Sequence, residues 1–369
     1  MKVLANRYLY KFSEIMPASV QVDLFDPKKL PQNVTDYDAI FVNTTTPLNE
    51  DTLPESGNIS FVATGSSGTD HLDLDYLHSK GISTGDANGC NALTVAEYII
   101  TAILFSLESE TFTTADLKAG VIGVGSVGTE VSQLLSRFSI PGVLYDPPRA
   151  ERDPEFNSAY FAELKECNIL TFHTPLTAGG QYPTHHLLNE SWLGETDFHM
   201  LINSARGGVI DEDVALRMLN KGYLKHLIVD TWENEPEFNP AVADAARFAT
   251  PHIAGYSIQS KRRATEMIVR QFCEHTGVDF SASDNLAPYK PELKESYSSL
   301  KEILLELHPL GWFDQKLREI AKLDEENRGE SFSLLRSEAP LRHEYSNIRV
   351  EPHHLSRFPE LEKLGIKPV

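Results

Sequence analysis

The sequence predicts an α/β protein whose central part is a doubly wound parallel sheet. Three observations lead to this fold class. Short apolar runs without alternation, such as residues 169–172 and 200–202, are typical of strands covered on both faces. Segments with apolar residues at helical spacing separate these runs, as expected when helices alternate with parallel strands. A glycine-rich turn at residues 123–128 joins one apolar run to a helical segment.

The first part of the chain predicts a small α/β unit of its own. Short apolar runs between turn-rich polar stretches indicate strands over residues 2–4, 20–24, 39–42 and 61–63. Apolar residues then recur at helical spacing and predict a long, largely buried helix over residues 92–107. The parallel sheet follows, with strands predicted over residues 121–124, 143–145, 169–172, 200–202, 227–229 and 248–249.

The C-terminal part predicts a separate small α/β module. Pro288 and Pro291 interrupt the pattern before it begins. Helices are expected over residues 300–307, 313–323 and 355–364, and strands over residues 331–335 and 348–350.

Charge and cysteine content exclude several classes of protein. The chain of 369 residues has 33 Lys plus Arg against 53 Asp plus Glu, a net charge of −20, so neither nucleic acid nor a membrane is an expected partner. An anionic substrate must then be held by a few placed cations. Three cysteines without a short pairing spacing argue against a disulfide scaffold, and no signal peptide or membrane-spanning run is evident. We therefore expect a cytoplasmic protein.

The glycine-rich turn predicts a dinucleotide site. Gly123 allows the tight turn, Gly125 lets a pyrophosphate approach the backbone, and Gly128 lets helix pack on strand. Asp146 ends the next strand, where its carboxylate can bind both ribose hydroxyls, so NAD is favoured over NADP. Arg149 nearby is the feature that would favour NADP, and the alternative for the turn is a purely structural role.

Several polar residues follow the predicted strands, and the carboxyl ends of parallel strands meet at one edge of a sheet. They are Thr174, Arg206, Asp230, Glu235 and His252.

Three of these residues form a candidate catalytic set. The Arg206 guanidinium suits bidentate binding of a 2-hydroxy or 2-oxo carboxylate, although a salt bridge to Asp211 is an alternative. The imidazole of His252 changes charge near working pH, so it could exchange a proton with an alcohol, although one of 13 histidines could equally be structural. Glu235 could hold that imidazole, or lie in a solvated acidic loop. Asp230 could contact the nicotinamide side.

No metal site is predicted. His185 and His186, like His353 and His354, are adjacent pairs that would not face one way on a helix. A Gly-x-Ser-x-Gly elbow is absent from the sequence, so a hydrolase has little support.

The order and spacing of these motifs resemble the D-2-hydroxyacid dehydrogenases over most of the first ~280 residues. The resemblance implies a Rossmann NAD domain and a flavodoxin-like substrate domain. It assigns Arg206, Glu235 and His252 to the catalytic set. Ser126, Val127, Thr174, Asp230 and Gly255 would touch NAD, together with the glycine turn and Asp146.

Within that family the chain is most similar to a subgroup that oxidises a phosphorylated sugar acid in vitamin B6 biosynthesis. The pointers are residues 68–71, 89–92, 146–149, 172–175 and 252–256, together with the additional C-terminal module. The resemblance implies that Thr44, Ser66 and Tyr256 touch substrate and that the C-terminal module is a dimerisation domain of a homodimer. The expected domains are residues 1–92 completed by about 256–284 for substrate, 93–255 for NAD, and 285–369 for dimerisation.

One feature departs from that subgroup. Between Lys29 and Lys118 the only Lys or Arg is Lys80, so the loop around Thr44 offers no cation for a phosphate. Hydroxyls, backbone amides or a distant cation must bind it, the candidates being Lys261 and a partner subunit's Arg342 or Arg349. Another 2-hydroxy acid as substrate, or an NAD-sensing binding protein without catalysis, are the alternative functions.

Overall fold

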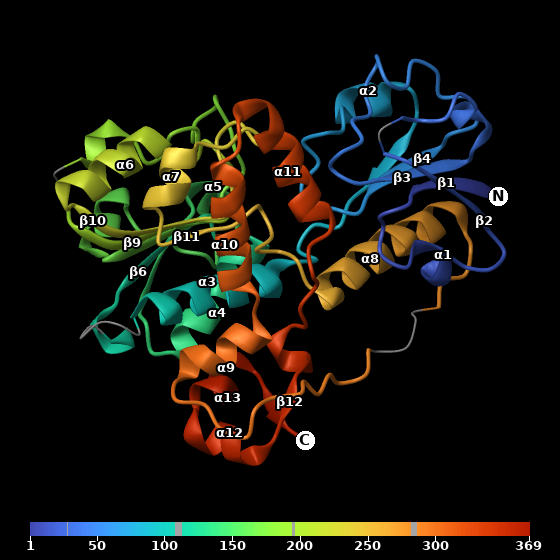
Figure 1. The fold of residues 1–369 in the computed structure, drawn as a ribbon. Coiled ribbons are helices and arrows are strands. Elements are labelled where there is room, and N and C mark those ends of the chain that lie inside the picture. The colour runs from blue at the N-terminus through green and yellow to red at the C-terminus, as the bar shows by residue number, and fades with distance from the viewer. Residues whose placement is uncertain (28, 108–112, 194–195, 282–285) are drawn as a thin grey trace. The chain divides into compact units, whose positions relative to one another are not determined.

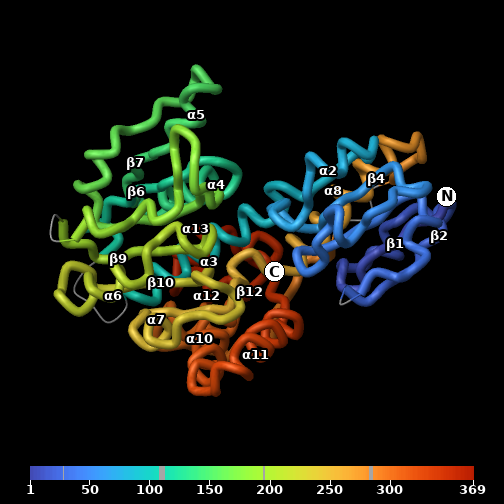
Figure 2. Tube along the Cα trace, turned by 90° about the horizontal axis from the view of Figure 1, so that it is seen from above, coloured from blue at the N-terminus to red at the C-terminus, as the bar shows by residue number. Residues whose placement is uncertain are grey.

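The computed structural model describes residues 1–27, 29–107, 113–193, 196–281 and 286–369, and it divides into two compact units. The first unit contains Met1–Asn91 and Ser257–Ala287, and the second contains Ala92–Tyr256 and Pro288–Val369 (Figure 1). The C-terminal segment therefore belongs to the second unit, and the chain end lies near strand β12 in both views (Figures 1 and 2). Among the described residues, no helix is both long and apolar enough to span a bilayer.

The first unit is a five-stranded parallel sheet in the order β2-β1-β3-β4-β5. This is the flavodoxin-like order, as predicted. The strands are β1 (Lys2–Asn6), β2 (Gln21–Phe25), β3 (Ala39–Val42), β4 (Phe61–Thr64) and β5 (Ser83–Gly85). The short and partly polar β5 carries no apolar run, which is why its sequence did not predict a strand.

Among the described residues of this unit, three helices accompany the sheet: α1 (Phe12–Ile15), α2 (Leu74–Ser79) and α8 (Ile258–Thr276). Ser257 caps the start of α8 with a hydroxyl that accepts from the Ser260 amide, and Gly277, with φ of +73°, caps its end. Its Phe272 ring lies 5.5 Å from Phe41 and 5.9 Å from Phe61, so a segment distant in sequence completes the core of the first unit.

The second unit contains a six-stranded parallel sheet in the order β11-β10-β9-β8-β6-β7. The order reverses beside β6, and a ligand crevice is expected at the carboxyl ends of the strands there. All six strands were predicted. Their bounds are Ala119–Ile122 (β6), Gly142–Tyr145 (β7), Ile169–Phe172 (β8), Phe198–Asn203 (β9), Leu224–Val229 (β10) and Phe248–Ala249 (β11).

Helices cover both faces of this sheet. The predicted long helix is confirmed as α3 (Ala92–Leu107), which is buried along most of its length and packs against α4 (Ser126–Arg137). The other face carries α6 (Glu212–Lys221) and α7 (Pro240–Ala245), and α5 (Pro147–Arg152) follows β7. Short 3₁₀ turns lie at Val34–Asp36, Thr114–Asp116, Phe161–Glu166, Glu190–Trp192 and Tyr345–Asn347.

The C-terminal segment is more helical than predicted. It contains α9 (Leu300–Leu307), α10 (Leu310–Ala321), α11 (Glu325–Ser337), α12 (Pro352–Arg357), α13 (Glu360–Leu364), β12 (Arg349–Val350) and β13 (Lys367–Pro368). The predicted strand over residues 331–335 is wrong, because it lies within α11, where Gly329, Phe332 and Arg336 share one helical face. The helix predicted over residues 355–364 is interrupted at Phe358 and Pro359.

A buried polar network connects this segment to α3. Arg342 forms an ion pair with Glu97, and the Thr94 hydroxyl donates to Glu344 at 2.6 Å. The side chains of Glu97 and Arg342 are 0% and 4% exposed. Arg342, which the sequence offered as a phosphate ligand, is thus held inside the second unit by Glu97.

Candidate active site

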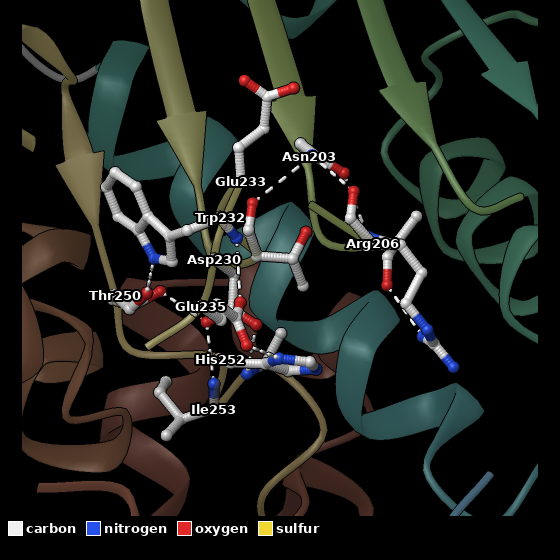
Figure 3. A network of polar contacts seen from close by, with 12 residues as sticks. Asn203, Arg206, Asp230, Trp232, Glu233, Glu235, Thr250, His252 and Ile253 are labelled. Atoms are coloured by element: carbon white, nitrogen blue, oxygen red, sulfur yellow. Dashed lines mark hydrogen bonds and ion pairs between the residues drawn. The ribbon is translucent and has the colours of Figure 1, made fainter. Parts of the chain in front are cut away.

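The loops after β9, β10 and β11 bring Arg206, Glu235 and His252 to one edge of the sheet (Figure 3). The three strands are neighbours in the sheet, and their last residues are in register, with Val229 opposite both Asn203 and Ala249. The expectation that distant segments converge at the carboxyl ends of the strands is therefore met within the second unit.

Glu235 and His252 form a direct pair. The distance between His252 Nδ1 and Glu235 Oε2 is 2.8 Å, and Glu235 Oε1 accepts a hydrogen bond from the Trp232 amide at the same distance. His252 has a φ of +58°, a conformation that side chains rarely adopt, so the loop holds the ring under local strain. With Nδ1 bound to the carboxylate, Nε2 is the nitrogen that can exchange a proton with a substrate.

The electrostatic environment keeps Glu235 ionised. Burial favours a raised pKa for this carboxyl, but the His252 ring and the Arg336 guanidinium outweigh burial and the pKa is lowered. A charged carboxylate beside His252 can fix its orientation and stabilise its protonated form.

Asp230 organises the loop that carries His252. Its side chain is 1% exposed, and it accepts hydrogen bonds from the Ile253 amide at 2.8 Å, the Ala254 amide at 2.9 Å and the Thr250 hydroxyl at 2.6 Å. Burial raises its pKa despite these donors. Asp230 therefore shapes the loop, whatever contact it also makes with a nicotinamide.

The loop that carries Arg206 packs closely against the loop that follows β10. A Cβ added at Gly207 would lie 1.7 Å from the Trp232 carbonyl oxygen, so only glycine fits there. The side-chain Nδ2 of Asn203 donates to the carbonyls of Arg206 and Thr231 and links the two loops (Figure 3). Asp211, the alternative partner considered for Arg206, caps α6 by accepting from the Val214 amide.

The glycine turn has the shape that a dinucleotide needs. Gly123 has φ of +84°, and a Cβ there would lie 2.8 Å from the His173 carbonyl. A Cβ at Gly128 would lie 2.0 Å from the Gly123 carbonyl oxygen, whereas a Cβ at Gly125 meets no atom within 4 Å. Gly125 thus leaves open space at the N-terminus of α4, where backbone amides and the helix dipole favour phosphate. Ser126 and Val127 form the first turn of this helix.

Asp146, Arg149 and Thr174 surround that turn. Asp146 accepts hydrogen bonds from the Val124 and Arg149 amides, which places its carboxylate against the glycine turn. Arg149 donates to the Val124 carbonyl and pairs with Asp153 at 3.2 Å, so its charge is already compensated and the arrangement fits NAD. The Thr174 hydroxyl oxygen is buried and lacks a hydrogen-bond partner among the described residues, as expected of a group that contacts a cofactor. Gly255 follows the loop bound by Asp230.

The predicted substrate residues fall in both units. Thr44 is exposed in the turn after β3, and Ser66 lies after the neighbouring β4, where its hydroxyl donates to the Gly68 carbonyl at 2.9 Å. Tyr256 is a half-buried residue at the end of the second unit's first segment.

The sequence did not predict a cluster around His186. The rings of His185 and His186 stack at 4.0 Å, and His186 pairs with Glu233 and lies 3.6 Å from Asp211. The argument that adjacent histidines cannot face one way is wrong here, because His186 has φ of +48° in a turn and does not lie on a helix. His185, His186 and Glu233 place ligand atoms within 4.8 Å of one another. The carboxylates of Glu233 and Asp211 hold His186 in place, and the pair with Glu233 links it to the loop that carries Glu235.

Known proteins resemble this chain in sequence and in fold. Residues 106–254 match the family "D-isomer specific 2-hydroxyacid dehydrogenase, NAD binding domain". Among curated relatives, erythronate-4-phosphate dehydrogenase of Pseudoalteromonas atlantica is 33% identical over 90% of this chain and 90% of its own. The enzymes of the same name from Proteus mirabilis and Yersinia pestis are 33% and 32% identical, over 95% and 99% of this chain and 94% and 98% of theirs.

Solved structures support the fold. D-2-hydroxyisocaproate dehydrogenase superposes with a TM-score of 0.62 and 21% identity, covering 76% of this chain and 99% of its own. D-lactate dehydrogenase of Aquifex aeolicus, solved with NAD and lactic acid, has a TM-score of 0.58 and 24% identity and covers 75% and 96% of the two chains. About a quarter of the present chain lies outside each of these superpositions.

Proposed function

Because the chain belongs to the erythronate-4-phosphate dehydrogenases, within the D-isomer-specific 2-hydroxyacid dehydrogenases, we propose that it oxidises 4-phospho-D-erythronate to the 2-oxo acid with NAD. This reaction belongs to pyridoxal phosphate (vitamin B6) biosynthesis. The protein is an NAD-dependent oxidoreductase, and its relatives match it over nearly their whole length.

Each member of the proposed catalytic set has one task. Arg206 binds the carboxylate and the oxygen on C2 with its planar guanidinium. His252 accepts the proton of the 2-hydroxyl on Nε2, and Glu235 holds Nδ1 and balances the positive charge that develops on the ring. Bound NAD⁺ supplies the acceptor for the hydride that leaves C2. Thr44, Ser66 and Tyr256 are proposed to contact the rest of the substrate.

The cofactor residues follow the geometry of the glycine turn. Gly123, Gly125, Ser126, Val127 and Gly128 are proposed to hold the pyrophosphate. The ribose hydroxyls are proposed to bind Asp146, and the nicotinamide half is proposed to meet Thr174, Asp230 and Gly255.

The observation that carries the proposal is the Glu235–His252 pair at the strand ends next to the Arg206 loop. A substrate panel tests it. The purified protein is mixed with NAD⁺ and, in turn, 4-phospho-D-erythronate, 3-phospho-D-glycerate, D-lactate and glycolate, while nicotinamide absorbance is followed. The highest kcat/KM is expected with 4-phospho-D-erythronate. Preference for another 2-hydroxy acid would reassign the substrate, and tight NAD binding without turnover would indicate a sensor.

The assembly and location are proposed on the same basis. We expect a homodimer formed through residues 285–369 and a cytoplasmic enzyme, in keeping with three cysteines that are all free and buried. Sedimentation of the full chain tests the dimer. Neither nucleic acid nor membrane is proposed as a partner of a chain with a net charge of −20.

A further inference from the structure

Helix α11, from the C-terminal segment, packs directly on the loop that carries Glu235. Phe332 is fully buried, and its ring lies 5.5 Å from that of Phe238. A Cβ added at Gly329 would lie 3.3 Å from Pro236 and 2.6 Å from the Glu237 carboxylate, so the helix backbone approaches the loop closely. The helix face formed by residues 329, 332 and 336 therefore lies against the loop that carries Glu235.

Arg336 lies on this face, one turn after Phe332. Its Cζ is 6.0 Å from the centroid of the Phe332 ring, and its side chain is hydrogen-bonded to Tyr256. Its Nε is buried without a hydrogen-bond partner among the described residues. A buried guanidinium nitrogen without an acceptor is costly in a finished structure, which indicates that a ligand completes the site.

The acidic groups near Arg336 are already engaged elsewhere. Burial tends to lower the pKa of Arg336, but Tyr256, Glu235 and Asp230 together raise it, so the cation is retained. Both oxygens of Glu235 accept from other groups, namely His252 and the Trp232 amide, and Asp230 accepts three hydrogen bonds of its own. Within the described part of the chain, Arg336 forms no ion pair of its own.

The substrate needs a second cation besides Arg206. A phosphorylated 2-hydroxy acid has two anionic ends, and Arg206 can bind only the carboxylate end. Of the two C-terminal arginines that the sequence suggested, Arg342 pairs with Glu97, and Arg349 donates to the carbonyls of Ser346 and Ile348. Arg336, by contrast, is hydrogen-bonded to Tyr256, which is a proposed substrate residue.

We infer that Arg336 binds the phosphoryl group of the substrate, so that the C-terminal segment supplies a specificity residue to the active site of its own chain. The inference rests on the proposed function. A planar guanidinium presents paired donors to phosphate oxygens, and Tyr256 orients it.

The test compares one substrate with and without its phosphoryl group. Arg336→Gln should lower kcat/KM for 4-phospho-D-erythronate by about 10²-fold more than kcat/KM for D-erythronate, mainly through KM, because any loss caused by removing a charge near Glu235 is common to both substrates. Arg336→Lys keeps a charge near Glu235 but lacks the fork, so the ratio of the two kcat/KM values should fall by about tenfold. If either variant loses activity equally with both substrates, Arg336 only positions Glu235 or the loop, and the inference is wrong.

Two controls separate this outcome from other failures. Lys322→Gln removes a positive charge from an exposed position of the same C-terminal segment, directly after α10, and should leave both substrates unaffected. If the Gln variant does not fold, the Lys variant decides the question with the same two substrates. Failure of the proposed function itself would appear in the wild-type protein, as preference for D-erythronate or for neither substrate.

Discussion

At the scale of single residues, the site depends on neighbours that hold each functional group in one orientation. His252 is bound at Nδ1 by Glu235, which is itself bound by a backbone amide of its own loop. Asp230 binds two amides of the His252 loop. Glu235 thus fixes the imidazole and Asp230 fixes its loop, both through hydrogen bonds.

Replacement of His252 tests the proton-transfer role. His252→Ala should lower kcat by about 10² to 10⁴-fold because the hydroxyl proton loses its acceptor. NAD affinity, measured by calorimetry, should change little because the glycine turn is untouched. His78→Ala, at an exposed position of the first unit, is the control. Wild-type turnover in the His252 variant would assign the proton transfer to another group.

At the scale of elements, the loops after parallel strands are fixed to one another by close backbone contacts. Gly207, in the loop after β9, lies directly against the Trp232 carbonyl of the loop after β10. His186, from a third segment, forms an ion pair with Glu233 of that same loop. Such contacts set the distance between Arg206 and the Glu235–His252 pair, so a small backbone shift should affect catalysis.

Gly207→Ala tests this contact. The new Cβ would lie 1.7 Å from the Trp232 carbonyl oxygen, so the loop must move. We expect kcat/KM to fall by about 10²-fold, the cost of misplacing a binding group by about 1 Å. Gly179→Ala, where a Cβ meets nothing within 4 Å, should leave kinetics and melting temperature unchanged. Full activity of the Gly207 variant would show that the loop position is not critical.

The sequence predicted those features that local patterns determine. Apolar runs located all six strands of the second unit. Ligands bind at the carboxyl ends of parallel strands, and this rule predicted that Arg206, Glu235 and His252 lie together although they come from separate segments. Features that depend on tertiary packing were missed. Residues 331–335 form part of α11 because Phe332 packs on Phe238, and no local pattern indicates that contact. Arg336 could not be recognised for the same reason.

At the scale of the whole molecule, the C-terminal segment is joined to the rest of the second unit through buried charges. Arg342 and Glu97 are both almost fully buried, and the Tyr345 amide donates to the same carboxylate at 2.8 Å. A buried ion pair contributes little relative to apolar packing, but removal of one partner leaves an uncompensated charge.

Arg342→Met should therefore destabilise the protein by about 3–5 kcal/mol, measured by urea unfolding. Glu97 would lose its cation while remaining buried beside Glu344. Arg357→Met, at an exposed position of α12, should change stability by less than about 0.5 kcal/mol. Equal stability of the two variants would show that the Glu97–Arg342 pair does not hold the segment in place.

Stability should also depend on pH through Glu212, the first residue of α6. Burial raises the pKa of this carboxyl to about 8, while its Oε1 accepts from the Glu233 amide at 2.9 Å. Between the ordinary value of about 4.5 and about 8, the folded protein holds a proton that the unfolded chain releases. The free energy of unfolding should therefore fall as pH rises across this window, by at most about 1.4 kcal/mol per pH unit, and level off above it.

Glu212→Gln isolates this contribution, because the amide oxygen can still accept from Glu233 but cannot ionise. The variant should match the wild type near pH 5 and exceed it in stability near pH 8, so its urea midpoints should vary less with pH. The matched control is Asp75→Asn, an exposed carboxylate in the first turn of α2, which removes a carboxylate from solvent and should leave the pH dependence unchanged. Parallel pH curves for the Glu212 variant and the wild type would show that this carboxyl is ionised in the folded protein.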